Sequence, residues 1–188
     1  IILKKKRNWV MNHAFLAKKY SEQEIEAALP KDLKIHRSKN VVQETAELLV
    51  QKKIVGWFQG ASEHGPRALG NRSILVDPRD PKMKDILNAR VKFREEFRPF
   101  APVIPLDRAD EYYDLNGADS KFMLLVPQVL KNAAPATTHV DNSARVQTTT
   151  REENGVYHDL ILEFEKLTGV PILLNTSFNI AGEPIVES

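Results

Sequence analysis

Residues 54–76, IVGWFQGASEHGPRALGNRSILV, contain two short apolar runs on either side of a glycine-rich loop. The runs at residues 54–58 and 73–76 have the length and composition of buried strands. Glycines recur in the loop between them, where they allow tight turns and a close approach of the backbone to a ligand. This stretch therefore predicts two strands of a sheet joined by a loop that is suited to binding.

Two helices are predicted before this stretch. Ser21 and Glu24 have the spacing of a capping box, which predicts a helix that Pro30 closes. Residues 41–53 carry apolar side chains at helical spacing, which predicts a second, amphipathic helix. Residues 1–20 are basic and irregular, and we expect them to be less ordered or packed as an appendage.

After residue 76 the pattern continues to alternate helices and strands. Asp80 and Pro81 predict the start of a helix through residue 91, and Gly169 is typical of the end of a later helix. Because Pro102 and Pro105 lack an amide hydrogen, a strand that contains them is expected at a sheet edge or to be irregular. Strands are expected at residues 100–106, 122–126, 144–150 and 170–174. This alternation predicts the α/β or α+β class.

The composition is that of an ordinary globular domain. The 188 residues fit one domain, with 42% hydrophobic and 28% charged residues. A formal charge of +2 argues against a strongly basic nucleic-acid binder, so a nucleic-acid partner is not expected. Because the chain has no cysteine and its five histidines lack metal-ligand spacing, we expect no metal centre built by the protein. The absence of cysteine suits a cytoplasmic protein. No apolar run approaches the roughly 20 residues of a membrane span.

Two arginines in the glycine-rich loop are the first candidate site residues. Arg67 and Arg72 lie in the sequence between the two predicted strands. Guanidinium groups pair bidentately with phosphate or carboxylate oxygens, so the pair predicts an anion site. The alternative, in which both arginines are solvated or paired with Glu63, is equally compatible with their spacing.

Cations alternate with aromatic residues directly after the predicted helix that ends at residue 91. Phe93, Phe97 and Phe100 are expected to face the core, which would fix the directions of Lys92 and Arg98. On the charge pattern alone, a solvated face with neighbouring glutamates is the more favoured alternative.

Small polar residues follow the last predicted strand. Asn175, Ser177 and Asn179 come at or just after its carboxyl end, where open α/β sheets place ligand groups. An ordinary polar turn is the alternative. Arg145 and Gln147 have the spacing that puts two side chains on one face of a strand.

Together these segments resemble the ordered motifs of one family, the carbamoyltransferase C-terminal region. The family includes nodulation protein U and antibiotic O-carbamoyltransferases. The resemblance extends over about residues 20 to 188, and its first motif is highly specific. The motifs are GPRALGNRS at residues 65–73, FRPFAP at 97–102, ARVQT at 144–148, NTSFN at 175–179 and GEP at 182–184. Asn142 stands where family members often have Gly, and Asn tolerates the positive φ of such a turn.

The resemblance implies a YrdC-like fold, an α/β domain with a twisted mixed sheet flanked by helices, at residues 41–188. It implies that residues 1–40 are a linker or helical appendage to a missing N-terminal Kae1-like domain. The first residue is not Met and the chain stops soon after the GEP motif. We therefore expect both ends, including the carboxyl end of the YrdC-like domain, to be cut from a longer protein.

The family's chemistry gives the expected function. The YrdC-like domain takes carbamoyl phosphate and ATP, with Mg²⁺ carried by the ATP, and makes carbamoyl adenylate. The Kae1-like domain then passes the carbamoyl group to an acceptor hydroxyl. A threonylcarbamoyl-adenylate synthase-like enzyme and a non-catalytic nucleotide- or RNA-binding module are the alternatives.

Carried onto this sequence, the resemblance implies a site at which several cations converge. Two polyanionic substrates need positioning and positive charge more than covalent help. We therefore expect the side chains to meet in one hollow although they lie far apart in sequence. The implied catalytic residues are Arg67, Lys92 and Arg98, and the implied substrate- or nucleotide-binding residues are Arg72, Arg145, Asn175, Ser177 and Asn179.

Overall fold

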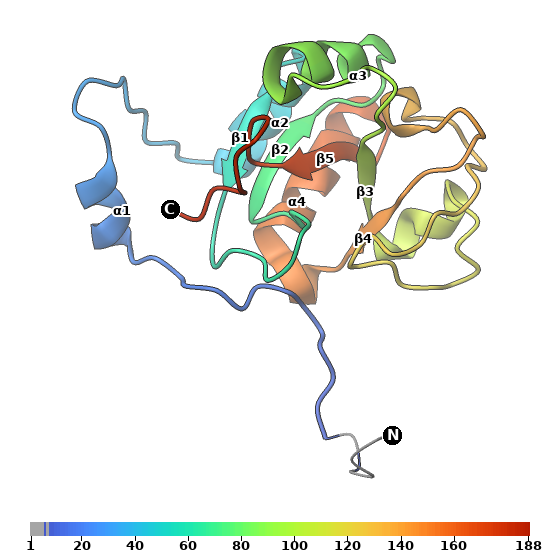
Figure 1. Ribbon diagram of the computed structural model, residues 1–188, viewed down its shortest axis with the longest axis horizontal. Coiled ribbons are helices and arrows are strands. Elements are labelled where there is room, and N and C mark those ends of the chain that lie inside the picture. The colour runs from blue at the N-terminus through green and yellow to red at the C-terminus, as the bar shows by residue number, and fades with distance from the viewer. Residues whose placement is uncertain (1–5, 7) are drawn as a thin grey trace.

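A five-stranded mixed sheet lies at the centre of the chain (Figure 1). The computed structural model describes residue 6 and residues 8–188. The spatial order is β1-β2-β5-β3-β4, and only β3 and β4 run parallel. The strands are β1 (Val55–Phe58), β2 (Arg72–Val76), β3 (Ala101–Pro105), β4 (Gln147–Thr149) and β5 (Leu173–Ser177). The expected α/β fold, a mixed sheet flanked by helices, is confirmed.

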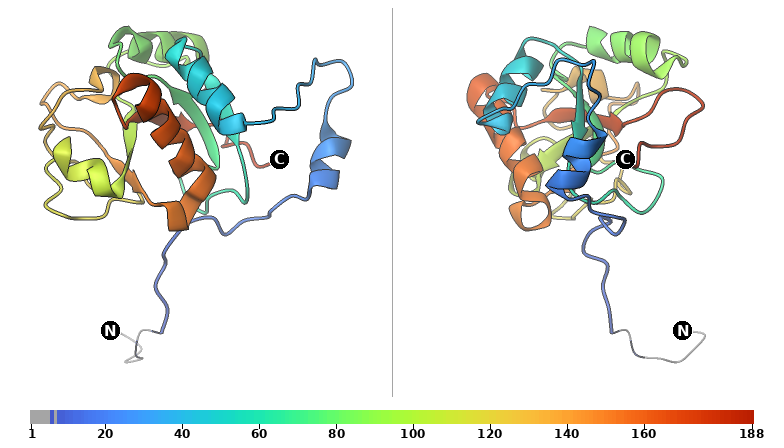
Figure 2. Two further views of the ribbon diagram at one scale, coloured as in Figure 1. Left: turned by 180° about the vertical axis from the view of Figure 1, so that it is seen from behind. Right: turned by 90° about the vertical axis from the view of Figure 1, so that its left-hand side faces the viewer.

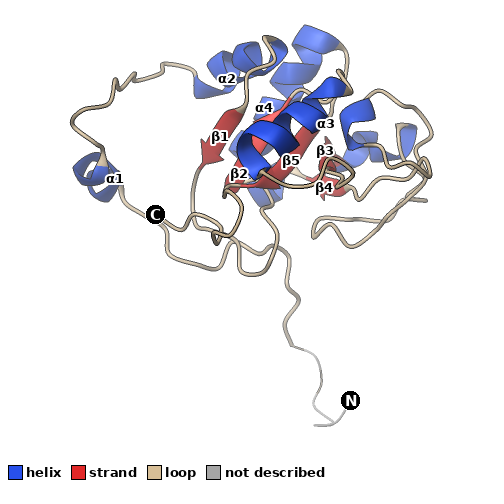
Figure 3. Cartoon of the chain, turned by 45° about the horizontal axis from the view of Figure 1, so that its top comes forward, coloured by secondary structure: helices blue, strands red, loops and turns tan. Residues whose placement is uncertain are grey.

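Helices cover both faces of the sheet. Helices α2 (Val41–Val50) and α4 (Arg151–Thr168) lie side by side on one face, as Figure 2 shows from behind. Helix α3 (Lys82–Leu87) lies over β2 and β5 on the other face (Figure 3) and continues into a π-helical turn, Asn88–Lys92. Two short 3₁₀ helices, Leu106–Glu111 and Pro135–Thr137, lie in the connections around β3 and β4.

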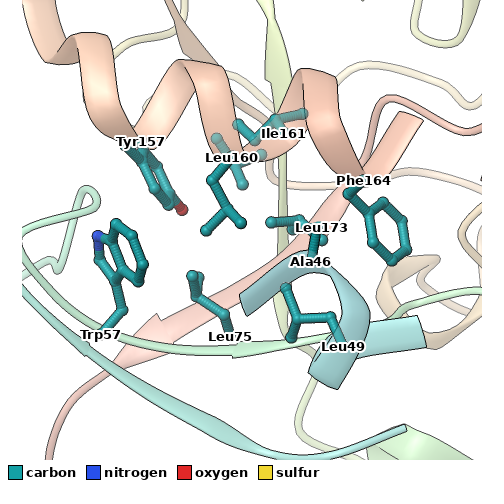
Figure 4. Packing of buried hydrophobic residues seen from close by; sticks show 10 residues of the cluster. Ala46, Leu49, Trp57, Leu75, Tyr157, Leu160, Ile161, Phe164 and Leu173 are labelled. Atoms are coloured by element: carbon teal, nitrogen blue, oxygen red, sulfur yellow. The ribbon is translucent and has the colours of Figure 1, made fainter. Parts of the chain in front are cut away.

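An apolar cluster of ten buried residues fills the space between the sheet and the pair α2 and α4 (Figure 4). Successive side chains of a strand point to opposite faces. Leu75 and Leu173 therefore point into this cluster, while Ile74 and Leu174 point toward α3. The members from β1 and the helices include Trp57, Leu49, Tyr157, Leu160 and Phe164.

Helix α1 (Glu22–Ala28) lies apart from the sheet in Figures 1 and 2 and buries none of its residues. The capping box predicted for it is present: Ser21 Oγ accepts from the amide of Glu24, and the Glu24 carboxylate accepts from the amide of Ser21. Of the basic segment at residues 1–20, residues 1–5 and 7 lie outside the described residues.

Several predicted boundaries are confirmed by the backbone. Gly169 ends α4 in the left-handed conformation, at φ +74°. By contrast, the N-cap of α3 is Pro81 and not Asp80 as predicted, and the α-helix ends at Leu87, before a π-helical turn through Lys92. Asp80 Oδ1 still accepts the amide hydrogen of Lys82 at 3.0 Å. Asn142 has a φ of +60°, as expected for a residue at a glycine-like turn position.

The prediction that residues 100–106 form an edge or irregular strand is wrong, because β3 lies between β5 and β4. Its ladder with β5 covers residues 101–103 and its ladder with β4 covers residues 103–105. Pro102 and Pro105 each lie in a part that pairs on one side only. An inner strand therefore tolerates both prolines.

Two other strand predictions need correction. The strand predicted at residues 170–174 forms at Leu173–Ser177 instead, as β5. It extends beyond residue 174 because Asn175, Thr176 and Ser177 pair with β2. No strand forms at residues 122–126, where Met123 has a φ of +56° and one isolated bridge, Leu125 to Val146, is made.

Candidate functional site: a cationic hollow

The glycine-rich loop between β1 and β2 is held by a carboxylate inside it. Glu63 Oε1 accepts from the amides of Leu69 at 2.6 Å and Asn71 at 2.8 Å. Gly70 has a φ of +115°, and a Cβ there would lie 2.4 Å from the Tyr157 ring, so the loop packs closely on α4. These contacts fix the part of the loop that carries Arg67.

Arg72 is buried and bound by protein oxygens. Its guanidinium donates to the carbonyls of Gln59 at 2.8 Å and Asn71 at 2.9 Å, and further to those of Gly60 and Glu187. The guanidinium carbon lies 3.5 Å from the centre of the Phe58 ring. Burial lowers the pKa of Arg72. Its side chain does not line the hollow in which Arg67 lies.

A hollow of about 460 Å³ opens between the glycine-rich loop, the start of β3 and the end of β5. Its polar wall consists of Arg67, Arg94, Arg145, Asn175, Thr176 and Ser177, which we call the cationic hollow. Four of these residues, Arg67, Arg145, Asn175 and Ser177, were predicted from the sequence, and the structure brings them together from three separate segments.

The cationic hollow carries an excess of positive charge in the part of the chain that the structure describes. Among the described residues, Arg67, Arg94 and Arg145 form no ion pair. The Nε atom of Arg145 is buried without a hydrogen-bond partner. Burial lowers the pKa of Arg145, and the charges of Arg67 and Arg94 lower it further. Three cations that repel one another around a polar hollow favour an anionic ligand.

Arg94 is a site residue that the sequence did not predict. Its Nε donates to Asn88 Oδ1 at 2.7 Å, and its guanidinium lies 4.6 Å from the centre of the Phe100 ring. Of the three phenylalanines expected to face the core, only Phe100 does so, since Phe93 is 64% and Phe97 78% exposed. Phe93 leaves the π-helical turn at φ +45°, which turns the following residue toward the hollow.

Lys92 lies behind the wall of the cationic hollow rather than in it. Its Nζ donates to the carbonyl of Ser177 and lies 3.3 Å from Ser177 Oγ. It also donates to Asn179, to the carbonyl at 3.0 Å and to Oδ1 at 2.9 Å. Burial, with a further effect from the charge of Arg94, lowers the pKa of Lys92 to about 8. Lys92 and Asn179 therefore support the Ser177 side of the hollow.

Arg98 lies at the rim. Its Nε is 2.8 Å from Glu95 Oε2, and its side chain is half exposed. Together with Phe93, Arg94 and Glu95 it borders a second, open hollow of about 740 Å³. Its charge contributes to lowering the pKa of Arg94, which is part of both hollows. The structure thus places Arg98 beside the cationic hollow but not in its wall.

Asn175 is 1% exposed and has one unsatisfied atom. Its Nδ2 donates to the Ala68 carbonyl at 3.1 Å and to Gln147 Oε1 at 2.7 Å. Its Oδ1 is buried without a hydrogen-bond partner. Gln147, which the sequence pairs with Arg145 by spacing, thus contacts the site through Asn175.

An apolar hollow of about 810 Å³ adjoins the cationic one and shares Pro66, Arg67 and Met123 with it. Its other lining residues include Met11, Leu69, Phe122 and Leu124. A ligand that combines a phosphate group with an apolar or aromatic group matches these two neighbouring hollows.

Two other kinds of feature are absent from the described part of the chain. Residue 6 and residues 8–188 contain no group of three or more His, Cys, Asp or Glu side chains arranged to hold a metal ion. None of the helices in that part is long and apolar enough to span a bilayer.

Comparison with known proteins points to one family. Residues 46–188 match the family model described as "Carbamoyltransferase C-terminus". Nodulation protein NolO of Bradyrhizobium diazoefficiens is 47% identical over 161 residues, 83% of this chain and 29% of that protein. Nodulation protein U of Sinorhizobium fredii is 43% identical over 156 residues, 81% of this chain and 28% of that protein. An uncharacterized protein of Synechocystis, sll1178, is 37% identical over 204 residues, 94% of this chain and 33% of that protein. The chain thus spans about a third or less of the length of these relatives.

Proposed function

The chain belongs to the carbamoyltransferase C-terminal family, and from that premise we propose that its cationic hollow binds carbamoyl phosphate and ATP and forms carbamoyl adenylate. The observation that carries this proposal is the set of three arginines, Arg67, Arg94 and Arg145, without an ion-pair partner in the described residues. Phosphate groups are the ligands that such a set binds most strongly.

The proposed chemistry suits these side chains. For the atoms to balance, carbamoyl phosphate first gives carbamate and inorganic phosphate by reaction with water. A carbamate oxygen then attacks the α-phosphate of ATP, which increases negative charge on phosphate oxygens and on the departing pyrophosphate. Fixed guanidinium groups stabilise that charge without reorganising during the reaction. Ser177, held from behind by Lys92, donates its hydroxyl hydrogen to Asn179 Oδ1 at 2.6 Å, so toward a ligand its oxygen is an acceptor suited to the N–H of a carbamoyl group. The neighbouring apolar hollow is suited to the base of ATP, and Mg²⁺ would arrive with the nucleotide.

Arg98 enters this proposal from the rim. An exposed ion pair such as that with Glu95 contributes at most about 1 kcal/mol. When a ligand binds, Arg98 can therefore leave Glu95 and pair with a phosphate group at little cost in free energy. We assign Arg98 the role of a second contact to the nucleotide phosphates, next to Arg94.

The acceptor step is proposed to take place in another part of the full-length protein. This chain matches 29% of NolO and 28% of nodulation protein U, so most of each relative lies outside the match. A Kae1-like domain in that remainder would carry the carbamoyl group to an acceptor hydroxyl, and the chain alone would not carbamoylate an acceptor. The YrdC-like identity of the present domain belongs to the same proposal.

Isothermal calorimetry with carbamoyl phosphate and with Mg²⁺–ATP tests the site. Loss of a hydrogen bond to a charged group costs about 1.5–3 kcal/mol, so Arg145→Met and Arg98→Ala should each weaken ATP binding by roughly 10- to 150-fold. The matched control is Arg151→Met, since Arg151 is exposed and paired with Asp159 on α4. Equal affinities of Arg145→Met and the control would exclude the cationic hollow as the binding site.

The same titrations separate the proposal from an RNA-binding module. A protein that follows a nucleic-acid backbone loses affinity steeply as salt rises, because each phosphate contact releases counterions. We expect RNA to bind weakly and not to compete with Mg²⁺–ATP. RNA that displaces ATP with a steep salt dependence would favour the binding module instead.

A further inference from the structure

Gln147 and Asn175 form a buried chain of amide groups that ends at the cationic hollow. Gln147 Nε2 donates to the Leu69 carbonyl at 2.8 Å. Gln147 Oε1 accepts from Asn175 Nδ2 at 2.7 Å, and the same Nδ2 donates to the Ala68 carbonyl at 3.1 Å. Both side chains are almost fully buried, with exposures of 3% and 1%.

The orientation of both amides follows from the two backbone carbonyls. A carbonyl oxygen only accepts, so the NH₂ group of Gln147 must face Leu69 and its oxygen must face Asn175. The NH₂ group of Asn175 then faces Gln147 and Ala68. If the Asn175 amide turned over, its oxygen would meet two other acceptors in a buried place, which is strongly unfavourable.

One acceptor is left over by this arrangement. Asn175 lines the cationic hollow, and its Oδ1 is buried without a hydrogen-bond partner among the described residues. A buried acceptor is costly until something donates to it, and a ligand in the hollow can supply the donor. The cations of the hollow attract an anion, whereas Asn175 Oδ1 requires an N–H or O–H group on that same ligand.

We propose that Gln147 is a positioning residue that fixes the Asn175 oxygen toward the ligand, so that the hollow selects a phosphate compound bearing an N–H group. This inference rests on the proposed function and sharpens it. Carbamoyl phosphate and acetyl phosphate have nearly the same size and charge, but acetyl phosphate has a methyl group in place of the NH₂ group. Acetyl phosphate would leave Asn175 Oδ1 unsatisfied and cover it with a methyl group.

The preference is measured with three ligands on the whole chain: carbamoyl phosphate, acetyl phosphate and inorganic phosphate. We expect carbamoyl phosphate to bind at least about tenfold more tightly than acetyl phosphate, as for a site built around a specific hydrogen bond. Equal affinities for these two ligands would overturn the inference and leave phosphate binding intact. Failure to bind any of the three would instead overturn the proposed function.

Variants at Gln147 test its positioning role. Gln147→Met removes the hydrogen bonds of Gln147 to Leu69 and Asn175 and leaves the Ala68 carbonyl alone to orient the Asn175 amide. The ratio of the affinities for carbamoyl phosphate and acetyl phosphate should therefore fall, while the affinity for inorganic phosphate stays within about twofold. Gln147→Glu keeps an oxygen toward Asn175, and as a buried neutral acid it can donate to Leu69, so it should retain the preference. An unchanged preference in Gln147→Met, or a loss of it in Gln147→Glu, would remove Gln147 from this role.

Gln59→Met is the matched control. Gln59 is a partly buried amide that donates to the side-chain oxygens of Asn71 and Asn154, neither of which lines the cationic hollow. Its replacement should lower stability but leave the preference for carbamoyl phosphate unchanged. If Gln59→Met abolished the preference as well, the effect of Gln147→Met would be attributed to general loosening and the positioning role rejected. If Gln147→Met does not fold, the preference for carbamoyl phosphate over acetyl phosphate, measured on the wild-type chain and on Gln147→Glu, still tests the proposal.

Discussion

Arg67 and Arg72 lie on the same loop and in the same sequence motif, yet their surroundings are opposite. Arg72 donates to four backbone carbonyls and lies on the Phe58 ring. Arg67 is exposed and makes one weak contact, to the Pro66 carbonyl at 3.3 Å. Backbone carbonyls bind the Arg72 guanidinium, whereas the Arg67 guanidinium lies in the wall of the cationic hollow. Two arginines of one motif thus have different surroundings, and we propose that one acts in folding and the other in binding.

The largest expected effect is the loss of stability when Arg72 is replaced. Arg72→Met removes a fully buried guanidinium and the hydrogen bonds that it donates to the carbonyls of Gln59, Gly60 and Asn71, and should lower the free energy of unfolding by about 3–5 kcal/mol. Arg67→Met should change it by less than about 0.5 kcal/mol, as for most surface substitutions. Urea denaturation of the two variants measures the difference. Similar losses in both would mean that the two arginines do not divide folding and binding between them.

The next effect concerns the backbone that separates the two arginines. Gly70→Ala forces a Cβ to within 2.4 Å of the Tyr157 ring at a φ of +115°, and should cost about 2–4 kcal/mol from strain and overpacking. Gly65 also has a positive φ, +126°, but a Cβ at that position would meet nothing within 4 Å. Gly65→Ala should therefore cost only about 1–2 kcal/mol of backbone strain. A larger loss for Gly65→Ala in thermal or urea unfolding would contradict the packing argument.

The same loop shows which parts of the molecule could be predicted from the sequence. The strands on either side of it were recognisable because their apolar runs are short and continuous, and Gly169 marked a helix end by its own conformational freedom. The arginine motif indicated an anion site, which stays a prediction, and Arg67 and Arg145 do line one hollow. The different surroundings of Arg72 were not predictable, because its partners are carbonyls, which every residue has.

Other failures of prediction have equally local causes. Phe93 was expected in the core because it is large and apolar, but the π-helical turn ends there in a left-handed conformation and leaves it exposed. The direction of Arg94 depends on that turn, so this residue was missed. Pro102 indicated an edge strand, because the sequence pattern could not show that residues 101–103 pair with β5 and residues 103–105 pair with β4. In each case a contact distant in sequence, or a rare backbone conformation, decided the outcome.

Lys92 lies between the two extremes that Arg67 and Arg72 represent. Like Arg72 it is buried and surrounded by oxygens, and like Arg67 it stands close to the cationic hollow, through Ser177. Burial lowers its pKa from 10.5 to about 8, so its charge is lost at a pH where every arginine remains charged. A rise in pH above about 8 therefore removes the charge of Lys92, whereas the neighbouring arginines stay charged.

The smallest expected effect is the response of the chain to pH above neutrality. As pH rises through about 8, Lys92 becomes neutral, and binding of Mg²⁺–ATP, already fully ionised there, should weaken by about two- to fivefold, roughly 0.4–1 kcal/mol. Stability should change in the opposite direction. Between pH 8 and 10.5 the unfolded chain holds this proton more strongly than the folded chain, so the contribution of Lys92 to the free energy of unfolding rises with pH. Calorimetry and urea denaturation from about pH 7 to 10 measure both trends, and Lys92→Met should abolish both. Identical pH profiles for the wild type and Lys92→Met would show that Lys92 neither titrates in this range nor acts on the bound ligand.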